Sequence, residues 1–496
     1  MTTPVTTPSA TIDAYLASLD EAQLATFARR YQTLAMADGA FVTLADGAEV
    51  AIPPILTPLV LSEDTQRSLS GDAHRIVTAI DRQARALLDG PDSPLRTRVL
   101  AALSPLEHAA MLATYREADA LATARVDFLV DGRGIARALE VNTTIPAMQG
   151  YSDAIAQAFL RAVGEQRGLD EARIGAALDA NGRNTDELLA SLLALHARRG
   201  GSTRGQRIAI VARPGDSQGG ELDHYVRRWC ALGQHAFRAT PSQVTSDGAR
   251  VLVDGAPVDL VYRHVFVRRL ATDEPLMQLL HDARAHPIWN PPSSHLELKA
   301  MLGLLSATCA DDAEAQRIGL TDDERGTLAR RLPWTRLCVP GPSTAPDGSA
   351  LADLLDFVLA NPASLVLKKS WDYGGRGVFL GAELSSSTSQ AKLHAVLGPR
   401  DRPYAWHELV EHIVRSGEAW VVQALVEVQP SPRTCIDDGG LVTRELYADV
   451  SAFTSLRCDV AVTGGAVRAS TSRIVNIQGG GGLVPLLREA AVRLIL

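Results

Sequence analysis

The chain has 496 residues, which is too many for one compact hydrophobic core, so we expect several domains. Hydrophobic residues make up 46% of the chain and charged residues 21%, which is typical of a soluble globular protein and excludes a disordered one. A net charge of -8 excludes a broad basic face, so we expect no nucleic acid and no anionic membrane as a partner.

The cysteines are odd in number, widely scattered and free of CxxC spacing, which argues against a disulfide framework and against a zinc site. The first ten residues lack the basic and apolar segments of a signal peptide, and no apolar run approaches the roughly 20 residues that span a bilayer. We therefore expect a cytoplasmic protein. The five cysteines are Cys230, Cys309, Cys338, Cys435 and Cys458.

Residues 1–120 form a predicted helical N-terminal region. A helix is predicted over residues 12–37, and the segment FVTLADGAEVAIP reads as a hairpin that turns at Asp46-Gly47, a pair that tolerates positive φ. Apolar stripes in the later helices, such as Ile76 and Ile80, are typical of core contacts. We assign no chemistry to this region.

Residues 121–197 begin with two strands, RVDFLVD and ARALEVN, which a short turn at residues 132–134 joins into a hairpin. One helix is predicted to begin near Ser152, and a second, NTDELLASLLALHA, is predicted to open with Thr185 as its N-cap. The following segment ARRGGSTRGQR has the composition of a linker and predicts a domain boundary.

Residues 206–295 alternate strands with helices, which predicts a small Rossmann-like α/β domain. Its glycine-bearing turn RPGDSQGGE matches neither common phosphate-binding loop, so we predict no nucleotide site there, although Arg213 or Glu221 can still face a substrate. Residues 296–496 mix helices with strands, including EAWVVQALVEV and CDVAVTGG, and predict an antiparallel sheet with one covered face. The predicted fold class is α/β (α+β).

The first candidate site lies on the hairpin of the second region. Two antiparallel strands joined by a tight turn can bring Asp127 and Glu140 within reach of one cation, and Asn142 projects from the same face as Glu140. Magnesium prefers oxygen ligands of this kind, and Arg125, on the same face as Asp127, can hold a transferring phosphoryl group. An acidic hairpin in solvent has the same pattern, so spacing alone leaves both interpretations open.

The second candidate site is the segment LVLKKSWDYGGRGVFLG, in which a strand ends in lysines and runs into a glycine-rich loop. Glycines at 374, 375 and 377 allow backbone N–H groups to close over a phosphate. Lys368 can add a positive charge there, whereas Lys369 points to the other face of the strand. A glycine-rich hairpin with two solvated lysines is the alternative.

Two further segments have more ordinary alternatives. The apolar strand that carries Gln423, Leu425 and Glu427 can read the edge of adenine with its backbone and bind ribose hydroxyls with the acid, but a plain core strand has the same pattern. Lys299 lies one turn into a predicted helix in which Leu296, Leu302 and Leu305 face inward, and a surface lysine is the alternative there.

Taken together, these residues resemble the ATP-grasp superfamily of carboxylate-amine ligases, and RVDFLVD…EVNTTIP is similar to the metal-binding hairpin of D-alanine–D-alanine ligases. The resemblance implies Mg2+ and ATP as cofactors. It implies magnesium ligands at Asp127, Glu140 and Asn142, and a phosphate contact at Arg125. It also implies an ATP site formed by Lys299, Lys368, Gly374, Gly375, Gly377, Gln423, Leu425 and Glu427.

The order of these segments is rotated, because the metal hairpin precedes the glycine loop instead of following it. In this respect the chain resembles the circularly permuted ATP-grasp proteins. The resemblance implies that residues 206–295 of this chain correspond to the pre-ATP-grasp α/β domain of those proteins. Gln423 stands where many members have Glu, and Asp372 where many have Gly. Either Arg468 or Arg473 can neutralise the transferring group, and Arg473 is our prediction.

The resemblance implies an ATP-dependent ligase that activates a small-molecule carboxylate as an acyl phosphate for attack by an amine. It implies amino acid or peptide substrates, whereas the identity of the acid and of the amine stays open. A catalytically inactive ATP-binding scaffold and a small-molecule kinase are the alternatives. The oligomeric state is equally open, and a homo-oligomer is compatible with the sequence.

Overall fold

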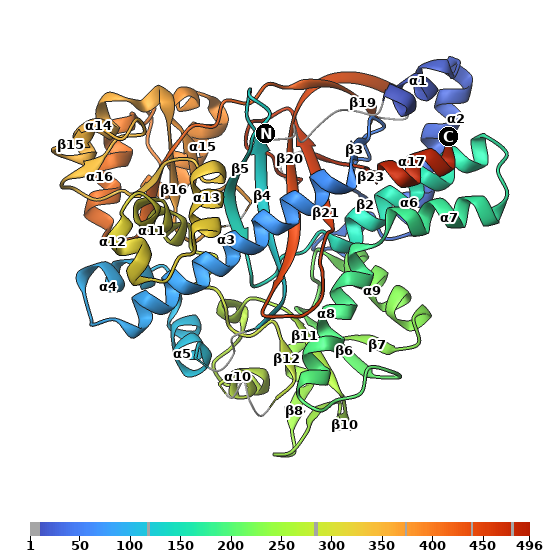
Figure 1. Cartoon of the computed structure of the whole chain (residues 1–496), viewed down its shortest axis with the longest axis horizontal. Helices are drawn as coiled ribbons and strands as arrows, with labels where there is room; N and C mark the ends of the chain where they lie inside the picture. The colour runs from blue at the N-terminus through green and yellow to red at the C-terminus, as the bar shows by residue number, and fades with distance from the viewer. Residues whose placement is uncertain (1–9, 117–119, 282–285, 373, 438–439, 478–480) are drawn as a thin grey trace.

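The computed structural model describes residues 10–116, 120–281, 286–372, 374–437, 440–477 and 481–496 (Figure 1). It is a mixed α/β protein in which three large sheets pack against helices. Within these ranges, no helix is long and apolar enough to cross a membrane. The predicted α/β fold class is confirmed, and the domain boundaries stay predictions.

The central sheet joins strands that lie more than 280 residues apart in the chain. Its order is β22-β21-β20-β4-β5, and β19 pairs with β20 outside this path. All of these pairings are antiparallel. The strands are β4 (Leu121–Val130), β5 (Ala136–Asn142), β19 (Ser431–Asp437), β20 (Gly440–Leu456), β21 (Gly465–Ser470) and β22 (Gly482–Val484).

Helices supply two separate cores to the central sheet. Helix α3 (Glu63–Asp89) runs across the sheet in Figure 1, and Ile76 and Ile80 belong to the same core as Phe128 of β4. Helix α6 (Gln149–Gln166) contributes to a second core, which includes Phe453 of β20. The apolar stripe predicted in the N-terminal helices is therefore a core contact.

The N-terminal region differs from the prediction at its first helix. The helix expected over residues 12–37 is divided into α1 (Ala10–Ser18) and α2 (Glu21–Ala37). The division follows from Asp20 and Gln23, whose side chains accept hydrogen bonds from each other's backbone N–H groups and so begin a new helix. The predicted hairpin is confirmed as β1 (Phe41–Thr43) and β2 (Glu49–Ala51).

The rest of the N-terminal region packs against elements from later parts of the chain. Strand β3 pairs in parallel with β23, and α17 at the C-terminus packs against α7. The bounds are β3 (Leu59–Leu61), α4 (Pro94–Leu100), α5 (Pro105–Thr114), α7 (Glu171–Asn181), β23 (Leu486–Arg488) and α17 (Glu489–Ile495).

A small parallel sheet, ordered β12-β11-β6-β7, matches the Rossmann-like alternation predicted from the sequence. A three-stranded antiparallel sheet, ordered β10-β9-β8, lies beside it. The bounds are α8 (Asn184–Arg198), β6 (Arg207–Ala212), α9 (Gly219–Ala231), β7 (His235–Ala239), η1 (Pro241–Gln243), β8 (Val244–Ser246), β9 (Val251–Val253), β10 (Ala256–Pro257), β11 (Leu260–His264), η2 (Val267–Arg269), α10 (Pro275–Leu280) and β12 (Ile288–Trp289).

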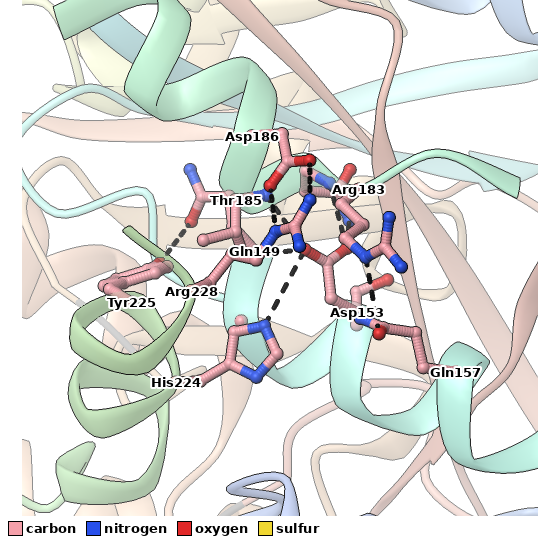
Figure 2. Close-up of polar contacts among 12 residues, drawn as sticks. Gln149, Asp153, Gln157, Arg183, Thr185, Asp186, His224, Tyr225 and Arg228 are labelled. Atoms are coloured by element: carbon pink, nitrogen blue, oxygen red, sulfur yellow. Dashed lines mark hydrogen bonds and ion pairs between the residues drawn. The ribbon is translucent and has the colours of Figure 1, made fainter. Parts of the chain in front are cut away.

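The N-cap of helix α8 is Arg183, two residues before Thr185, the predicted N-cap. The carboxylate of Asp153, on α6, accepts hydrogen bonds from the backbone N–H groups of Asn184 and Thr185, each at 2.9 Å. Thr185 donates its hydroxyl to the same carboxylate, as Figure 2 shows. A partner from another helix therefore performs the capping that local sequence assigns to a threonine.

The third large sheet is antiparallel and has the order β13-β18-β16-β17, which confirms the antiparallel sheet predicted for the C-terminal region. The bounds are α11 (Lys299–Cys309), α12 (Asp312–Arg317), α13 (Asp322–Arg331), β13 (Thr335–Leu337), β14 (Ser343–Thr344), β15 (Ala350–Leu351), α14 (Leu354–Ala360), η3 (Pro362–Ser364), β16 (Leu365–Lys369), β17 (Val378–Leu380), η4 (Gly381–Glu383), α15 (Ser387–Leu397), α16 (Trp406–Ser416) and β18 (Trp420–Ala424).

Two predicted strands are wrong in whole or in part. The segment CDVAVTGG is not a strand before its last residue, Gly465, where β21 begins, and the N–H groups of Thr463 and Gly464 donate to the carboxylate of Glu187. The strand EAWVVQALVEV ends at Ala424, where the N–H of Leu425 turns to the carbonyl of Ser364.

A close backbone approach between α9 and the segment before β1 gives a test of this packing. A Cβ on Gly220 would lie 2.3 Å from the carbonyl oxygen of Gly39. Neither this Cβ nor the backbone oxygen can move away by rotation of a side chain. Gly220→Ala should therefore lower the free energy of unfolding by at least about 2 kcal/mol in urea titrations. The matched control is Gly175→Ala in α7, where a Cβ meets nothing within 4 Å, and it should stabilise by about 0.5–1 kcal/mol. Equal effects of the two substitutions would contradict the packing described.

Candidate active site

The hairpin of β4 and β5 places its polar residues in direct cross-strand pairs. Asp127 lies opposite Glu140, and Arg125 lies opposite Asn142. A β-bulge next to the first pair shifts the register between Asp127 and Phe128. Directly opposite residues project from the same face of a sheet, so all four side chains are directed to one side of the hairpin.

Asp127 is the most heavily bonded of these residues. Arg125 donates from Nε and Nη2 to its two carboxylate oxygens at 2.7 and 2.9 Å, and Ser451 of β20 donates at 2.8 Å. Arg468 of β21 and the amide of Asn142 also contact this carboxylate, at 3.1 and 3.3 Å. Burial disfavours the charged form, but the two guanidinium groups outweigh it and lower the pKa of Asp127 below its ordinary value. Asp127 therefore stays ionised near neutral pH.

Glu140 is more accessible than Asp127 and meets a lysine instead of an arginine. Its side chain is 33% exposed, and its Oε2 lies 3.3 Å from the amine of Lys299. Among the described residues, no three His, Cys, Asp or Glu side chains form a group that can hold a metal ion. A magnesium ion bound at Glu140 and Asn142 would therefore need further oxygen ligands from phosphates or water, which is its usual coordination in proteins.

The structure brings the two predicted lysines to the same hairpin. Lys299, the first residue of α11, is buried and also donates to the backbone oxygen of Asp372 at 3.0 Å. Lys368 is buried at the end of β16 and donates to the carbonyl of Leu139 at 3.3 Å. Burial lowers the pKa of Lys368 to about 8, even though the charge of Glu140 opposes this shift. Neither lysine is a surface residue, which removes the alternative interpretation of both.

Two of the three predicted glycines reach the candidate site. Gly374 and Gly375 have φ of 65° and 71°, which favour glycine, and a Cβ on Gly375 would lie 2.5 Å from the Ile474 side chain. The amide of Asn476 donates to the carbonyl of Gly374 at 2.8 Å and links this loop to the segment after β21. Gly377 packs instead against Lys369 and Asp372 and does not itself line the cavity of Lys368. Tyr373 lies outside the described residues.

The predicted adenine-binding segment is only partly at the site. Gln423 is buried on β18 and donates to the hydroxyl of Thr335 at 3.0 Å. Leu425 follows the strand, and its backbone N–H is bonded to Ser364. Glu427 lines a neighbouring cavity, which shares Ala424, Leu425 and Val426 with the cavity of Lys368 and so adjoins it.

A first cavity lies between the central sheet and the antiparallel sheet of the C-terminal region. It measures about 130 Å³ and collects residues from five separate segments of the chain. We call it the inter-sheet cavity. Its polar or glycine lining residues are Asp127, Glu140, Lys368, Gly374, Gly375, Gln423, Asp449, Arg468, Arg473 and Asn476, and its apolar residues include Leu129, Val366 and Leu425.

A second cavity, of about 460 Å³, adjoins the first and reaches the small parallel sheet. We call it the arginine cavity because of the guanidinium groups in its lining. Glu140, Gly374, Arg468 and Asn476 line both cavities, so the two meet at these residues. The charged residues of the arginine cavity are Arg125, Glu140, Arg213, Asp216, Arg269, Asp372, Arg376 and Arg468.

The two arginines weighed from the sequence have different surroundings. The side chain of Arg468 is 14% exposed and bridges Asp127 to Asp449, with its Nε 3.1 Å from the Asp449 carboxylate. Arg473 lies after β21, where its Nε is 3.3 Å from Glu383 and 3.4 Å from the Tyr447 hydroxyl. Arg468 is thus bonded directly to the Asp127 side chain, whereas Arg473 pairs with residues outside this cluster.

Sequence reasoning missed Asp449, Ser451 and Asn476 as site residues. Asp449 and Ser451 alternate along β20, and their positions opposite Arg468 and Asp127 could be found only once the strand pairing was known. Burial raises the pKa of Asp449, and the charge of Arg468 opposes this. Asp372 was noticed only as a departure from the glycine loop, although it lines the arginine cavity with Glu140.

Comparison with known proteins supports a fold assignment only. No protein-family model matches the chain, and no curated protein matches it in sequence. Among solved structures, the chain is similar to a glutathione synthetase-like effector, GSS30, from Globodera pallida in its apo form. The likeness has a TM-score of 0.58 at 11% identity and covers 95% of this chain and 98% of the other. The chain therefore shares its overall fold with this glutathione synthetase-like protein.

The buried amine of Lys368 gives a test that separates its contribution to stability from its contribution to binding. Its pKa of about 8 lies below the ordinary 10.5, so the unfolded chain binds more protons between these values and stability rises with pH in that window. At pH 7 the amine of Lys368 is charged in both states, so the full cost of burying this charge lowers the stability of the folded protein. Lys368→Met should therefore raise the free energy of unfolding at pH 7, by up to about 3 kcal/mol, and by much less near pH 10.

The same variant should lose binding of a non-hydrolysable Mg-ATP analogue in isothermal titration, because the charge predicted to contact phosphate is gone. The matched control is Lys369→Met, since Lys369 is the adjacent residue and pairs with Glu418 at 2.8 Å on the other face. It should bind the analogue normally. Unchanged binding by Lys368→Met would remove Lys368 from the nucleotide site.

Proposed function

We propose that this protein is an ATP-dependent carboxylate-amine ligase that forms an amide or peptide bond and releases ADP and phosphate. The observation that carries the proposal is the meeting of Lys299, Lys368 and Glu140, from three distant segments, at the edge of the inter-sheet cavity. Two buried lysines beside one carboxylate suit the phosphates and magnesium ion of a nucleotide. The likeness to a glutathione synthetase-like protein supports the same conclusion.

The residues present fit Mg-ATP in their chemistry. Glu140 and Asn142, with Asp127 behind them, supply the oxygen donors that would hold magnesium. Lys299 and Lys368 would face the phosphates, and Gly374 and Gly375 leave room for close backbone approach. The inter-sheet cavity of about 130 Å³ is smaller than the roughly 300 Å³ of ordinary ligand sites, but it shares lining residues with the arginine cavity and with the cavity of Glu427.

The arginine cavity would hold the carboxylate substrate. Its volume of about 460 Å³ lies within the range of small-molecule sites, and it adjoins the inter-sheet cavity at Glu140 and Arg468. When bound, Mg-ATP supplies the phosphoryl group and the carboxylate becomes an acyl phosphate, which an amine such as that of an amino acid or peptide then attacks. Arg125 and Arg468, which both bond to Asp127, would neutralise the charge on the transferring group, a role in which Arg468 replaces Arg473 in our proposal.

Hydroxylamine trapping tests this function. The full-length protein is incubated with Mg-ATP, hydroxylamine and pooled small carboxylates, and new hydroxamates are sought by mass spectrometry. An ATP-dependent hydroxamate is expected, because hydroxylamine captures an acyl phosphate. A stable phosphorylated product would indicate a kinase instead, and bound but unconsumed ATP would indicate a scaffold.

Glu140→Gln should lower the rate of this reaction by at least about a hundredfold, because it removes a charged magnesium ligand, while nucleotide binding changes less. The matched control is Glu418→Gln, because Glu418 also pairs with a lysine and is similarly exposed, but lies outside both cavities. It should react at the wild-type rate. Normal turnover by Glu140→Gln would show that the metal assignment is wrong.

A further inference from the structure

The segment between β5 and α6 has an unusual backbone beside the candidate site. Ala147 and Met148 have φ of 44° and 81°, in the left-handed region that non-glycine residues rarely adopt. Both residues are buried, and Met148 lines the arginine cavity. Such a conformation persists only where surrounding contacts hold it.

The backbone of this segment holds the guanidinium of Arg125. Arg125 donates from Nη1 to the carbonyl of Pro146 and, at 3.4 Å, to that of Ala147. Its Nε and Nη2 donate to the carboxylate of Asp127. The position of the guanidinium therefore depends on the carbonyl directions of residues 146 and 147, which the left-handed conformation sets.

Glu221 of α9 binds the backbone at the C-terminal end of this segment, where α6 begins. Met148 is the N-cap of α6 but makes no side-chain capping bond, and the backbone N–H of Gly150 donates instead to Glu221 Oε1 at 3.1 Å. A Cβ on Gly150 would lie 3.1 Å from Glu221 Cγ, so the carboxylate fits closely against the start of the helix. Glu221 is fully buried and does not line either cavity.

A chain of hydrogen bonds fixes Glu221 to the strand that carries Arg125. Tyr225 donates to Glu221 at 2.8 Å and contacts the side-chain oxygen of Gln149 at 3.0 Å, as Figure 2 shows for Tyr225 and Gln149. Gln149 donates in turn to the hydroxyl of Thr123, two residues before Arg125 on β4. Burial raises the pKa of Glu221, and the charge of Arg125 is among the influences that oppose this rise.

We propose that Glu221 is a positioning residue, which holds the Arg125 guanidinium in place through the backbone of residues 146–150. The inference rests on the proposed function, because that function gives Arg125 the transferring phosphoryl group to neutralise. Loss of the Glu221 carboxylate frees the N-terminus of α6, the left-handed residues relax, and the carbonyls that hold Arg125 turn away.

Asp153, on α6, offers a matched comparison for Glu221. It is also a buried carboxylate that accepts backbone N–H groups from the first residues of a helix, in this case α8 (Figure 2). Its carboxylate bonds to Asn184 and Thr185 and lies 4.0 Å from His224, and it lines neither the inter-sheet cavity nor the arginine cavity. Glu221→Gln and Asp153→Asn therefore remove equivalent capping charges, one linked to Arg125 and one not.

The experiment compares both variants in the full-length protein with the acid found by trapping. Each should lower Tm. At a temperature where both are folded, Glu221→Gln should lower kcat for hydroxamate formation by at least about tenfold with KM for ATP within about twofold of wild type, because misplacement of a catalytic group slows the chemical step. Asp153→Asn should keep kcat within about twofold. Equal losses of kcat in the two variants would mean a merely structural role and would overturn the proposal.

A second variant and a crystal structure keep the test independent of folding and of the reaction. Ala147→Gly removes the steric cost of positive φ, so adding it to Glu221→Gln should restore at least part of kcat, and no recovery would count against the proposal. If the wild type forms no hydroxamate, the proposed function fails, but crystal structures still decide the inference. Arg125 should leave the carbonyls of residues 146 and 147 in Glu221→Gln and stay in Asp153→Asn. An unmoved Arg125 in Glu221→Gln would overturn it.

Discussion

The buried ion cluster of Arg125, Asp127, Asp449 and Arg468 holds the centre of the molecule together. Its members come from β4, β20 and β21, so two segments more than 300 residues apart must pair in one register before the charges meet. A buried charge without a partner costs several kcal/mol, whereas two carboxylates and two guanidinium groups compensate each other. A shift of β20 by one residue would direct Asp449 to the other face. The cluster therefore specifies the sheet as well as lining the site.

The same cluster explains why the first metal ligand predicted from sequence is not the most available one. Both oxygens of Asp127 already accept hydrogen bonds from guanidinium groups, whereas Glu140 is partly exposed and meets the amine of Lys299. Asp127 thus acts as a charged support for Arg125 and Arg468, and Glu140 and Asn142 are the donors that face outward. The hairpin therefore carries a fully paired carboxylate, Asp127, beside a more exposed one, Glu140.

Local sequence predicted much of the fold but not the contacts made across it. The alternation of Asp127, Glu140 and Asn142 was sufficient to predict a shared face, since a hairpin pairs residues close in sequence. The capping of α8 by Asp153 was not predictable from Thr185. The path of residues 458–463 was not predictable either, because it depends on a hydrogen bond to Glu187 of α8. That Lys299 and Lys368 meet at Glu140 followed from the family resemblance alone, because no spacing relates segments 160 to 230 residues apart.

Features that lower stability gather around the junction of the two cavities. Lys368 is buried with its pKa depressed, and Ala147 and Met148 adopt a strained backbone within the same part of the fold. Selection for stability alone would replace a buried amine with an apolar side chain and a left-handed alanine with glycine. Such costs are typical of sites where geometry serves a reaction. Because Glu140 and Arg468 line both cavities, this junction is where a phosphate donor and a carboxylate acceptor would have to meet.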